Sequence, residues 1–304
     1  MKKIFIISSC VFLLLAIVFF GLSMYESRQL EIEQEEIDDL MKDVFITDTT
    51  PTTDTTNSAT NDVPSTGTSD DMPVTGSTTE NTETEASEPD TTTNPPKQND
   101  KPKYTTPVAV DIDELKKKNS DIGGWIYLEN SNVNYPFVFS TGNEYLRKSI
   151  YGKSSSAGTI YCYDNQKISS VEDMDKNIVF YGHNMNNGTM FYYVDYLRRN
   201  PKYLNNEYNK YIYIYTEKYI YKYQIFSVYK IEKDENFNQI YFKGESDFQS
   251  FCNSLYEKSV YKGFRPDFSD NAHIITFATC TSGSSKTHRT ALHAVLVDIS
   301  TNNY

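Results

Sequence analysis

Short hydrophobic runs recur along roughly the last 200 residues of the chain, and their composition is that of β-strands. They are rich in Val, Ile, Tyr and Phe and are separated by polar or glycine-containing segments. Strands are predicted at 125–128, 133–139, 158–163, 177–181, 211–215, 219–230, 273–279 and 290–299. A polar break at Glu217 and Lys218 between two alternating runs indicates a hairpin. About eight strands with few helices favour a closed barrel or a sandwich.

Helical spacing of apolar residues occurs in only a few places in this region. Helices are predicted at 111–119, 190–199 and 246–259. Asp111 is suited to cap the first of them, which places Leu115 on its apolar face. In the last helix, Phe248, Phe251, Cys252 and Leu255 fall on one face. The predicted fold is therefore mainly β, with helices at its periphery.

The start of the chain is a long apolar run. Residues 4–22 are apolar except for two serines, and about 20 such residues span the hydrocarbon core of a bilayer. A cleaved signal peptide is the alternative, but its apolar region is usually about 7–15 residues, and residues 21–24 match a cleavage site poorly. We therefore expect an uncleaved anchor in the lipid bilayer through residues 4–24. The two lysines that precede it would stay in the cytoplasm, and everything after Tyr25 would lie outside.

Two segments of different composition follow this run. Residues 26–44 are acidic, with Leu30, Ile37 and Val44 at heptad spacing; a solvated helix is favoured over a coiled-coil dimer, because three positions are too few to argue a supercoil. Residues 47–103 are rich in Thr, Ser, Asp, Asn and Pro and contain no aromatic residue. Such a segment buries too little apolar surface to offset its ordering entropy. We interpret it as a disordered stalk that lifts the folded part away from the lipid.

The distribution of charge supports this division of the chain. Residues 1–103 contain 7 Lys/Arg and 19 Asp/Glu, whereas residues 104–304 contain 22 of each, which together give the net charge of −12. A neutral folded part without a basic stripe argues against nucleic acid as a partner. The predicted organisation is a cytoplasmic start and anchor at 1–25, an acidic juxtamembrane helix at 26–46, the stalk at 47–103 and the folded domain at 104–304.

The number of cysteines outside the expected anchor is odd. Cys10 lies in the apolar run, and Cys162, Cys252 and Cys280 lie beyond it. At least one external thiol is therefore unpaired within the chain, and such a thiol is either buried and inert or reactive. Whether the other two pair is left open. No Cys or His spacing typical of a zinc site is present, so we expect no metal.

Three polar residues stand at predicted strand ends. His183 follows strand 177–181, Cys280 ends the apolar strand 273–279, and Arg289 begins the final strand. A thiol is mostly protonated at neutral pH, and a neighbouring imidazole can share its charge. Acyl transfer then forms an oxyanion, which needs fixed donors such as a guanidinium. The three residues together suit cysteine-dependent acyl transfer.

Each of these residues also has a plainer interpretation. A strand cysteine is usually a small core hydrophobe, a lone loop histidine is more often structural than catalytic, and an arginine at a strand start is usually solvated. Their joint appearance at strand ends favours a catalytic role, but spacing alone leaves both the catalytic and the structural interpretation open.

Several motifs resemble those of class B sortases, cysteine transpeptidases of Gram-positive bacteria. Residues 276–280 read TFATC, similar to the sortase signature TLxTC with Phe277 in place of leucine, and Arg289 matches the sortase arginine. Residues 181–185 read YGHNM and 188–191 read GTMF, similar to the histidine segment of class B. Further matches are GWI at 124–126, NYP at 134–136 and the stretch 151–160. The long segment before the folded domain departs from the family, whose class B members usually have a shorter connection.

The resemblance implies an eight-stranded sortase-type barrel and a defined chemistry. Cys280 would attack the carbonyl of a threonine in a C-terminal sorting signal of a secreted protein. His183 would protonate the departing amine and then activate the incoming one, and Arg289 would hold the substrate and the oxyanion. The substrate or oxyanion contacts implied are Ala278, Thr279, Thr281, Ser282 and Asn184. The acceptor would be a cell-wall or pilin amine, and no cofactor is implied.

Two other functions remain open at this stage. A cysteine endopeptidase would use the same residues with water as the acceptor. A non-enzymatic surface module would use a tyrosine-rich barrel to bind a ligand. Acceptor choice depends on the shape of the groove, which the sequence does not reveal.

Overall fold

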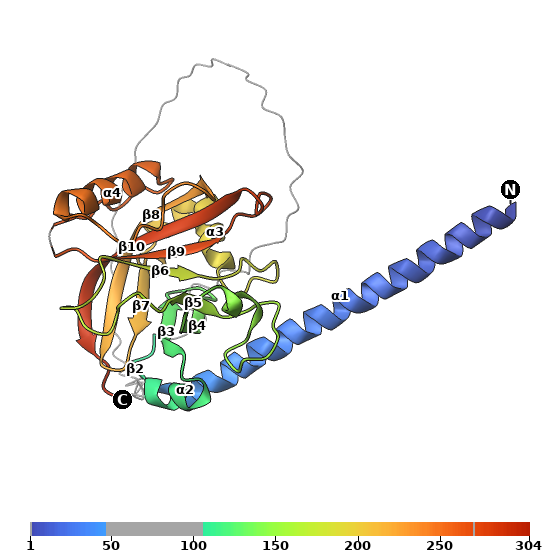
Figure 1. Cartoon of the computed structure of the whole chain (residues 1–304), viewed down its shortest axis with the longest axis horizontal. Coiled ribbons are helices and arrows are strands. Elements are labelled where there is room, and N and C mark those ends of the chain that lie inside the picture. The colour runs from blue at the N-terminus through green and yellow to red at the C-terminus, as the bar shows by residue number, and fades with distance from the viewer. Residues whose placement is uncertain (1, 47–105, 270) are drawn as a thin grey trace, which may run out of the picture. The chain divides into compact units, whose positions relative to one another are not determined.

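The computed structural model describes the backbone of residues 2–46, 106–269 and 271–304, with side chains described for residues 12, 13 and 15–46 in the first range. Eight strands form a closed barrel in the order β10-β8-β7-β3-β4-β5-β6-β9 (Figure 1). They are β3 (Ile122–Leu128), β4 (Asn134–Ser140), β5 (Ile160–Tyr163), β6 (Asn177–Tyr181), β7 (Tyr211–Tyr215), β8 (Tyr219–Glu232), β9 (Ile274–Cys280) and β10 (His288–Thr301). The predicted strands and the hairpin β7–β8 are confirmed, and the fold is a barrel, not a sandwich.

Helices lie at the periphery of the barrel. They are α1 (Lys2–Val44), α2 (Ile112–Lys118), α3 (Tyr192–Arg199) and α4 (Glu245–Lys258), with short 3-10 helices η1 (Glu144–Arg147), η2 (Pro201–Asn205) and η3 (Glu207–Asn209). The cap predicted for the first short helix is present, because the backbone N–H of Glu114 donates to the Asp111 carboxylate at 2.7 Å. Periodicity predicted neither the 3-10 helices nor the two-residue strands β1 (Phe45–Ile46) and β2 (Ala109–Val110).

Alternation along the strands separates the inside of the barrel from its outer face. On β9, Ile275 and Phe277 join the cluster that fills the barrel, whereas Ile274 and Ala278 join a cluster beneath α4. Both faces of β9 are therefore buried, which explains why this strand reads as a continuous apolar run. Because side chains alternate along a strand, Cys280 points to the same face as Ala278, which is the outer face of the barrel.

A buried polar network connects the strands that lead to the three predicted catalytic residues. The Thr276 hydroxyl donates to Asn177 Oδ1 on β6 at 2.9 Å and contacts His293 Nδ1 on β10 at the same distance. Because that hydroxyl hydrogen is already donated, His293 donates through Nδ1, and its Nε2 accepts from Tyr229 on β8 at 3.1 Å. Burial, with a further contribution from Lys258, lowers the pKa of His293 to about 3. The neutral imidazole thus fixes β6, β9, β10 and β8 to one another.

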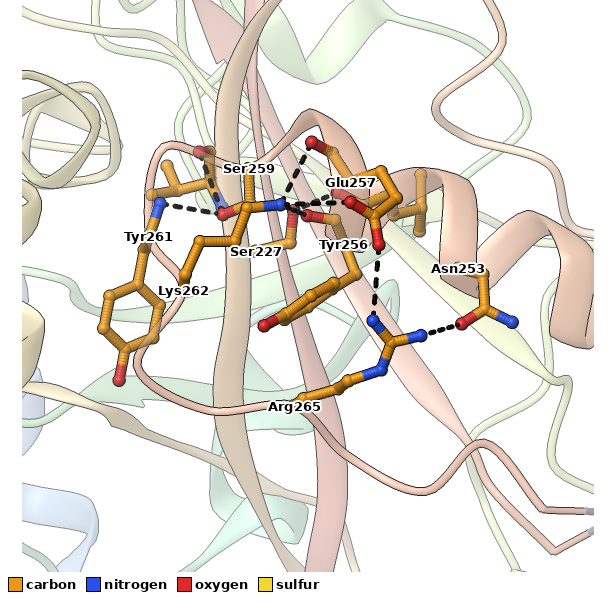
Figure 2. Close-up of polar contacts among 10 residues, drawn as sticks. Ser227, Asn253, Tyr256, Glu257, Ser259, Tyr261, Lys262 and Arg265 are labelled. Carbon is orange, nitrogen blue, oxygen red and sulfur yellow. Dashed lines mark hydrogen bonds and ion pairs between the residues drawn. The ribbon is translucent and has the colours of Figure 1, made fainter.

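The C-terminal end of α4 is held by the segment that follows it (Figure 2). Lys262 donates to the carbonyl oxygens of Tyr256 and Glu257 in the last turn of the helix, and the backbone N–H of Ser259 also donates to Tyr256. Arg265 donates to the Asn253 side chain at 2.9 Å and to the Glu257 carboxylate at 3.3 Å. These contacts hold α4 over the outer face to which Cys280 belongs.

The second half of α1 packs against the barrel. Leu40, Met41 and Val44 are 2%, 8% and 0% exposed and share a cluster with Trp125. Ile37 packs against the same cluster. The heptad face of residues 26–44 therefore contacts the folded domain. This corrects both interpretations of that face, since it is neither solvated nor the seam of a coiled-coil dimer.

The first half of α1 is apolar and exposed. The large apolar side chains described between Phe12 and Leu22 are more than half exposed. Within the described residues, however, the structure contains no helix both long enough and apolar enough to cross a membrane. The transmembrane anchor expected through residues 4–24 is therefore not supported.

The described residues on either side of the predicted stalk are paired with each other. Strand β1 (Phe45–Ile46) pairs with β2 (Ala109–Val110), and the backbone N–H of Val108 donates to the Ile46 carbonyl at 2.8 Å. Residues 47–105, which include the predicted stalk, lie outside the described residues. The second half of α1 contacts the barrel directly, and the role proposed for the stalk stays a prediction.

We expect Leu40→Ala in the full chain to reduce the free energy of α1 docking by about 2–5 kcal/mol, because the side chain is nearly fully buried. The single tryptophan, Trp125, packs against Phe45 with ring centroids 4.9 Å apart, so its fluorescence in a urea titration reports undocking. Leu22→Ala is the matched control, because it makes the same change on the same helix at a side chain 59% exposed. Equal effects of the two substitutions would contradict docking.

Candidate active site

Cys280 and Arg289 occupy directly paired positions on neighbouring antiparallel strands. The Cα of Cys280 at the end of β9 is opposite that of Arg289 at the start of β10. Residues directly opposite one another in such a ladder point to the same face, with Cβ atoms about 4.5–5.5 Å apart. The thiol and the guanidinium stem therefore share the outer face, and both side chains are half-buried.

His183 is held beside the end of β9 by contacts of its two neighbours. β6 and β9 are parallel, and the backbone N–H of Gly182 donates to the Ala278 carbonyl at 3.3 Å. On the other side of the histidine, the Asn184 amide donates to the Cys280 carbonyl at 2.8 Å. His183 is thus bracketed by contacts to Ala278 and Cys280. The three residues predicted from strand ends meet at one edge of the barrel.

The imidazole of His183 is oriented by a backbone carbonyl. Its Nε2 lies 2.9 Å from the Leu146 carbonyl oxygen, which only accepts, so Nε2 carries a hydrogen and Nδ1 is the nitrogen that exchanges protons. Burial lowers the pKa of His183, and the charge of Arg147 adds to this, while the hydrogen bond to Leu146 opposes it. The neutral imidazole is therefore favoured at neutral pH.

Replacing Arg147 with glutamine should raise the pKa of His183, because it removes a cation that disfavours the imidazolium. The protonated imidazole would then persist to higher pH, and the limb of the pH–rate profile that reports His183 would move upward. The measurement is the pH dependence of kcat/KM for peptide cleavage. Lys148→Gln is the control, since it removes an equal charge from the adjacent residue, which is not among the groups that shift His183. Identical profiles for the two variants would contradict the assignment.

Arg289 is anchored through backbone carbonyls. Its Nη1 donates to the Ser285 carbonyl at 2.7 Å and to the His288 carbonyl at 2.9 Å. Among the described residues it forms no ion pair with a carboxylate. The remaining guanidinium N–H groups can therefore donate to a substrate carbonyl or an oxyanion.

The residues expected to contact substrate or the oxyanion also form contacts within the protein. The Thr279 hydroxyl donates to the Gly182 carbonyl at 2.8 Å, and Thr281 Oγ1 lies 3.1 Å from Thr290 Oγ1. Ala278, Thr279 and Thr281 are buried. Ser282 is exposed, and the Asn184 amide lies 3.2 Å from its hydroxyl. Of the residues expected to contact substrate or the oxyanion, Ser282 is therefore the most exposed to solvent.

Burial distinguishes the three thiols beyond residue 46. Cys162 and Cys252 are fully buried, and no disulfide links them or Cys280. Burial raises the pKa of Cys162, and burial together with Glu245 raises the pKa of Cys252 to about 12. Both are therefore suppressed as nucleophiles, whereas Cys280 is partly exposed.

Sequence reasoning missed Asp195, a fully buried carboxylate on α3. It contacts Ser282, which follows Cys280 by two residues, and Thr290, which follows Arg289. Its spacing to Arg198 and Arg199 is that of helical ion pairs, and these pairs are present. That spacing predicts an ion pair on the helix surface. The contacts of Asp195 with Ser282 and Thr290 at the β9–β10 edge could therefore not be predicted from it.

The fold and the site together define a class: a closed β-barrel with a cysteine, a histidine and an arginine at adjoining strand ends. Comparison with known proteins gives the family. A family model for the sortase domain matches residues 126–297. Sortase B of Staphylococcus aureus is 28% identical over 61% of this chain and 73% of its own length. Sortase B of Listeria monocytogenes is 30% identical over 57% of this chain and 68% of its own.

A solved structure gives the same result. The X-ray structure of Clostridium perfringens sortase B covers 62% of this chain and 100% of its own, with a TM-score of 0.55 and 27% identity. The chain belongs to the sortase family, and its relatives place it in class B. It is accordingly a cysteine transpeptidase in the general sense of that family.

Proposed function

We propose that this sortase cleaves a C-terminal sorting signal of secreted proteins after threonine and transfers the acyl group to a cell-wall or pilin amine. The observation that supports this best is the direct pairing of Cys280 with Arg289 at the β9–β10 edge. It puts a nucleophile and a permanent donor for the oxyanion on one face. His183 at the adjoining strand end supplies the proton transfers.

The first half of the reaction forms a thioester. The Cys280 thiol gives its proton to Nδ1 of the neutral His183, and the thiolate that results attacks the threonine carbonyl carbon. The oxygen that gains the negative charge accepts hydrogen bonds from Arg289. The C–N bond then breaks, and the departing amine takes a proton from Nδ1 of the His183 imidazolium. The acyl group remains on sulfur, and His183 is left neutral.

The second half transfers the acyl group. An incoming amine attacks the thioester carbonyl and gives a proton to Nδ1 of His183. The C–S bond breaks, an amide forms, and the Cys280 thiolate returns beside a protonated imidazole. Because burial favours neutral His183, its Nδ1 is unprotonated at this stage and can accept the proton.

The test is to incubate the full chain in mild detergent with a library of threonine-containing peptides and with amine acceptors, and then to weigh the products. We expect cleavage after threonine and peptide joined to the amine. If saturating amine yields only the free acid, the endopeptidase alternative holds. If no peptide is cleaved and a thiol probe leaves Cys280 unlabelled in the folded protein, the enzymatic proposal is wrong.

Attachment to a lipid surface is the proposed localisation, with the barrel on the outer side of the cytoplasmic membrane. The support is the run of exposed apolar side chains between Phe12 and Leu22 on α1. Phe19→Glu with Phe20→Glu should move the protein from the membrane fraction to the soluble fraction of cells. An unchanged distribution would contradict this localisation.

A further inference from the structure

Asp195 is a buried carboxylate with partners on three elements. Its Oδ1 accepts from the Thr290 hydroxyl at 2.6 Å and from Arg198 Nε at 2.8 Å. Its Oδ2 accepts from the backbone N–H of Ser282 at 3.3 Å and lies 3.3 Å from Arg199 Nε. Both oxygens are therefore shared between the carboxylate's own helix and the β9–β10 edge.

The carboxylate is held in its charged form. Burial by itself raises the pKa of Asp195, but the hydrogen bonds from Thr290 and Arg198 and the charge of Arg198 outweigh it and leave the pKa below its usual value. A buried charge is tolerated only where it is paired and its lone pairs are satisfied. These contacts therefore hold the Asp195 side chain in place.

The two contacts away from α3 fall beside the two catalytic candidates of the β9–β10 edge. Ser282 lies two residues after Cys280 and begins the loop that leads to β10, and Thr290 directly follows Arg289. Asn184 holds the same loop from the histidine side, through the Cys280 carbonyl and the Ser282 hydroxyl. The backbone after the thiol is therefore fixed between α3 and the segment that follows His183.

We infer that Asp195 is a positioning residue for the transpeptidation: it fixes the loop after Cys280 and the start of β10 to one carboxylate, and so sets the thiol relative to the Arg289 guanidinium. The inference rests on the proposed function. Asp195 touches neither substrate nor the reacting atoms and acts through Ser282 and Thr290. Because displacement of a catalytic group by about 1 Å can reduce a rate about 100-fold, its removal should affect turnover strongly.

Two substitutions test the contacts to the β9–β10 edge. Asp195→Asn keeps the shape but replaces one acceptor oxygen with a donor and removes the charge. Thr290→Val removes only the hydroxyl that donates to Asp195. We expect kcat to fall about 10–100-fold for Asp195→Asn and by less for Thr290→Val, with KM changing less than kcat. Asp195→Glu, which restores the charge, should recover part of the loss.

Arg199→Gln is the matched control. It breaks an ion pair of the same carboxylate on the helix and leaves the contacts to Ser282 and Thr290 in place. Thermal unfolding of each variant separates stability from turnover. If Asp195→Asn and Arg199→Gln lower kcat equally, or if Asp195→Asn and Thr290→Val keep kcat within twofold, the positioning role is wrong.

A second measurement does not depend on peptide turnover. The rate at which iodoacetamide alkylates Cys280, measured against pH, should change in Asp195→Asn and not in Arg199→Gln. If the wild-type chain cleaves no peptide, the proposed function fails first, and the alkylation profile then decides the structural part of the inference. An unchanged profile in Asp195→Asn overturns it.

Discussion

Cys280→Ala is expected to abolish peptide cleavage, with a loss of at least about 10³-fold, because no other described thiol is both exposed and beside Arg289. The side chain is partly exposed at a strand end, so the substitution leaves no large cavity and the fold should be retained. Product formation by mass spectrometry and the far-UV circular dichroism spectrum measure the two effects.

Cys252→Ala is the matched control for this substitution. It removes the same atom from a fully buried position on the inner face of α4 and should lower stability while leaving turnover per folded molecule unchanged. Retention of activity in Cys280→Ala, or its loss in folded Cys252→Ala, would show that Cys280 is not the nucleophile.

His183→Gln should reduce kcat by about 10²–10⁴-fold, the range typical of a general acid–base. Glutamine can still donate to the Leu146 carbonyl, so the loop geometry is largely kept while the titratable nitrogen is lost. The acylation step, which needs a proton on the departing amine, should slow most. Single-turnover measurement of thioester formation separates that step from amine attack.

The control for the histidine is His273→Gln. His273 also contacts a backbone carbonyl, that of Asp175 at 3.1 Å, and burial also lowers its pKa, but it precedes β9 at the opposite end from Cys280. A small effect of His273→Gln and a large effect of His183→Gln would assign the acid–base role by position. Equal effects, or a threefold change or less in His183→Gln, would contradict it.

The sequence was most informative where structure depends on near neighbours. Strand β6 was predicted with its observed bounds, because both ends are marked by polar residues or glycine around a short apolar run. The cap of α2 was predicted because it depends on residues three positions apart. The class B resemblance rested on motifs that are contiguous in the chain, and the family comparison confirmed it.

Residues distant in the chain decided the remainder. The face of α1 that contains Val44 packs against Trp125, 81 positions away, so heptad spacing alone suggested a solvated helix or a dimer. The pairing of β1 with β2, which lie on either side of the predicted stalk, likewise joins segments distant in the chain. The Thr279 hydroxyl donates a hydrogen bond to the Gly182 carbonyl. These two residues are 97 positions apart, so no local sequence pattern predicts the bond.

By itself the sequence determined the strands, the peripheral helices, the family and the candidates Cys280, His183 and Arg289, because apolar periodicity and short motifs are properties of the local chain. Only the tertiary structure decided the order of the strands around the barrel, that Cys280 is opposite Arg289, and that Asp195 contacts both the loop after Cys280 and the start of β10. The physical reason is that strand register and burial are set by packing between segments far apart in the chain. The neutral state of His183 follows from burial, and the charge of Asp195 is kept by hydrogen bonds and an arginine that outweigh its burial. Both could therefore be assigned only from the folded chain.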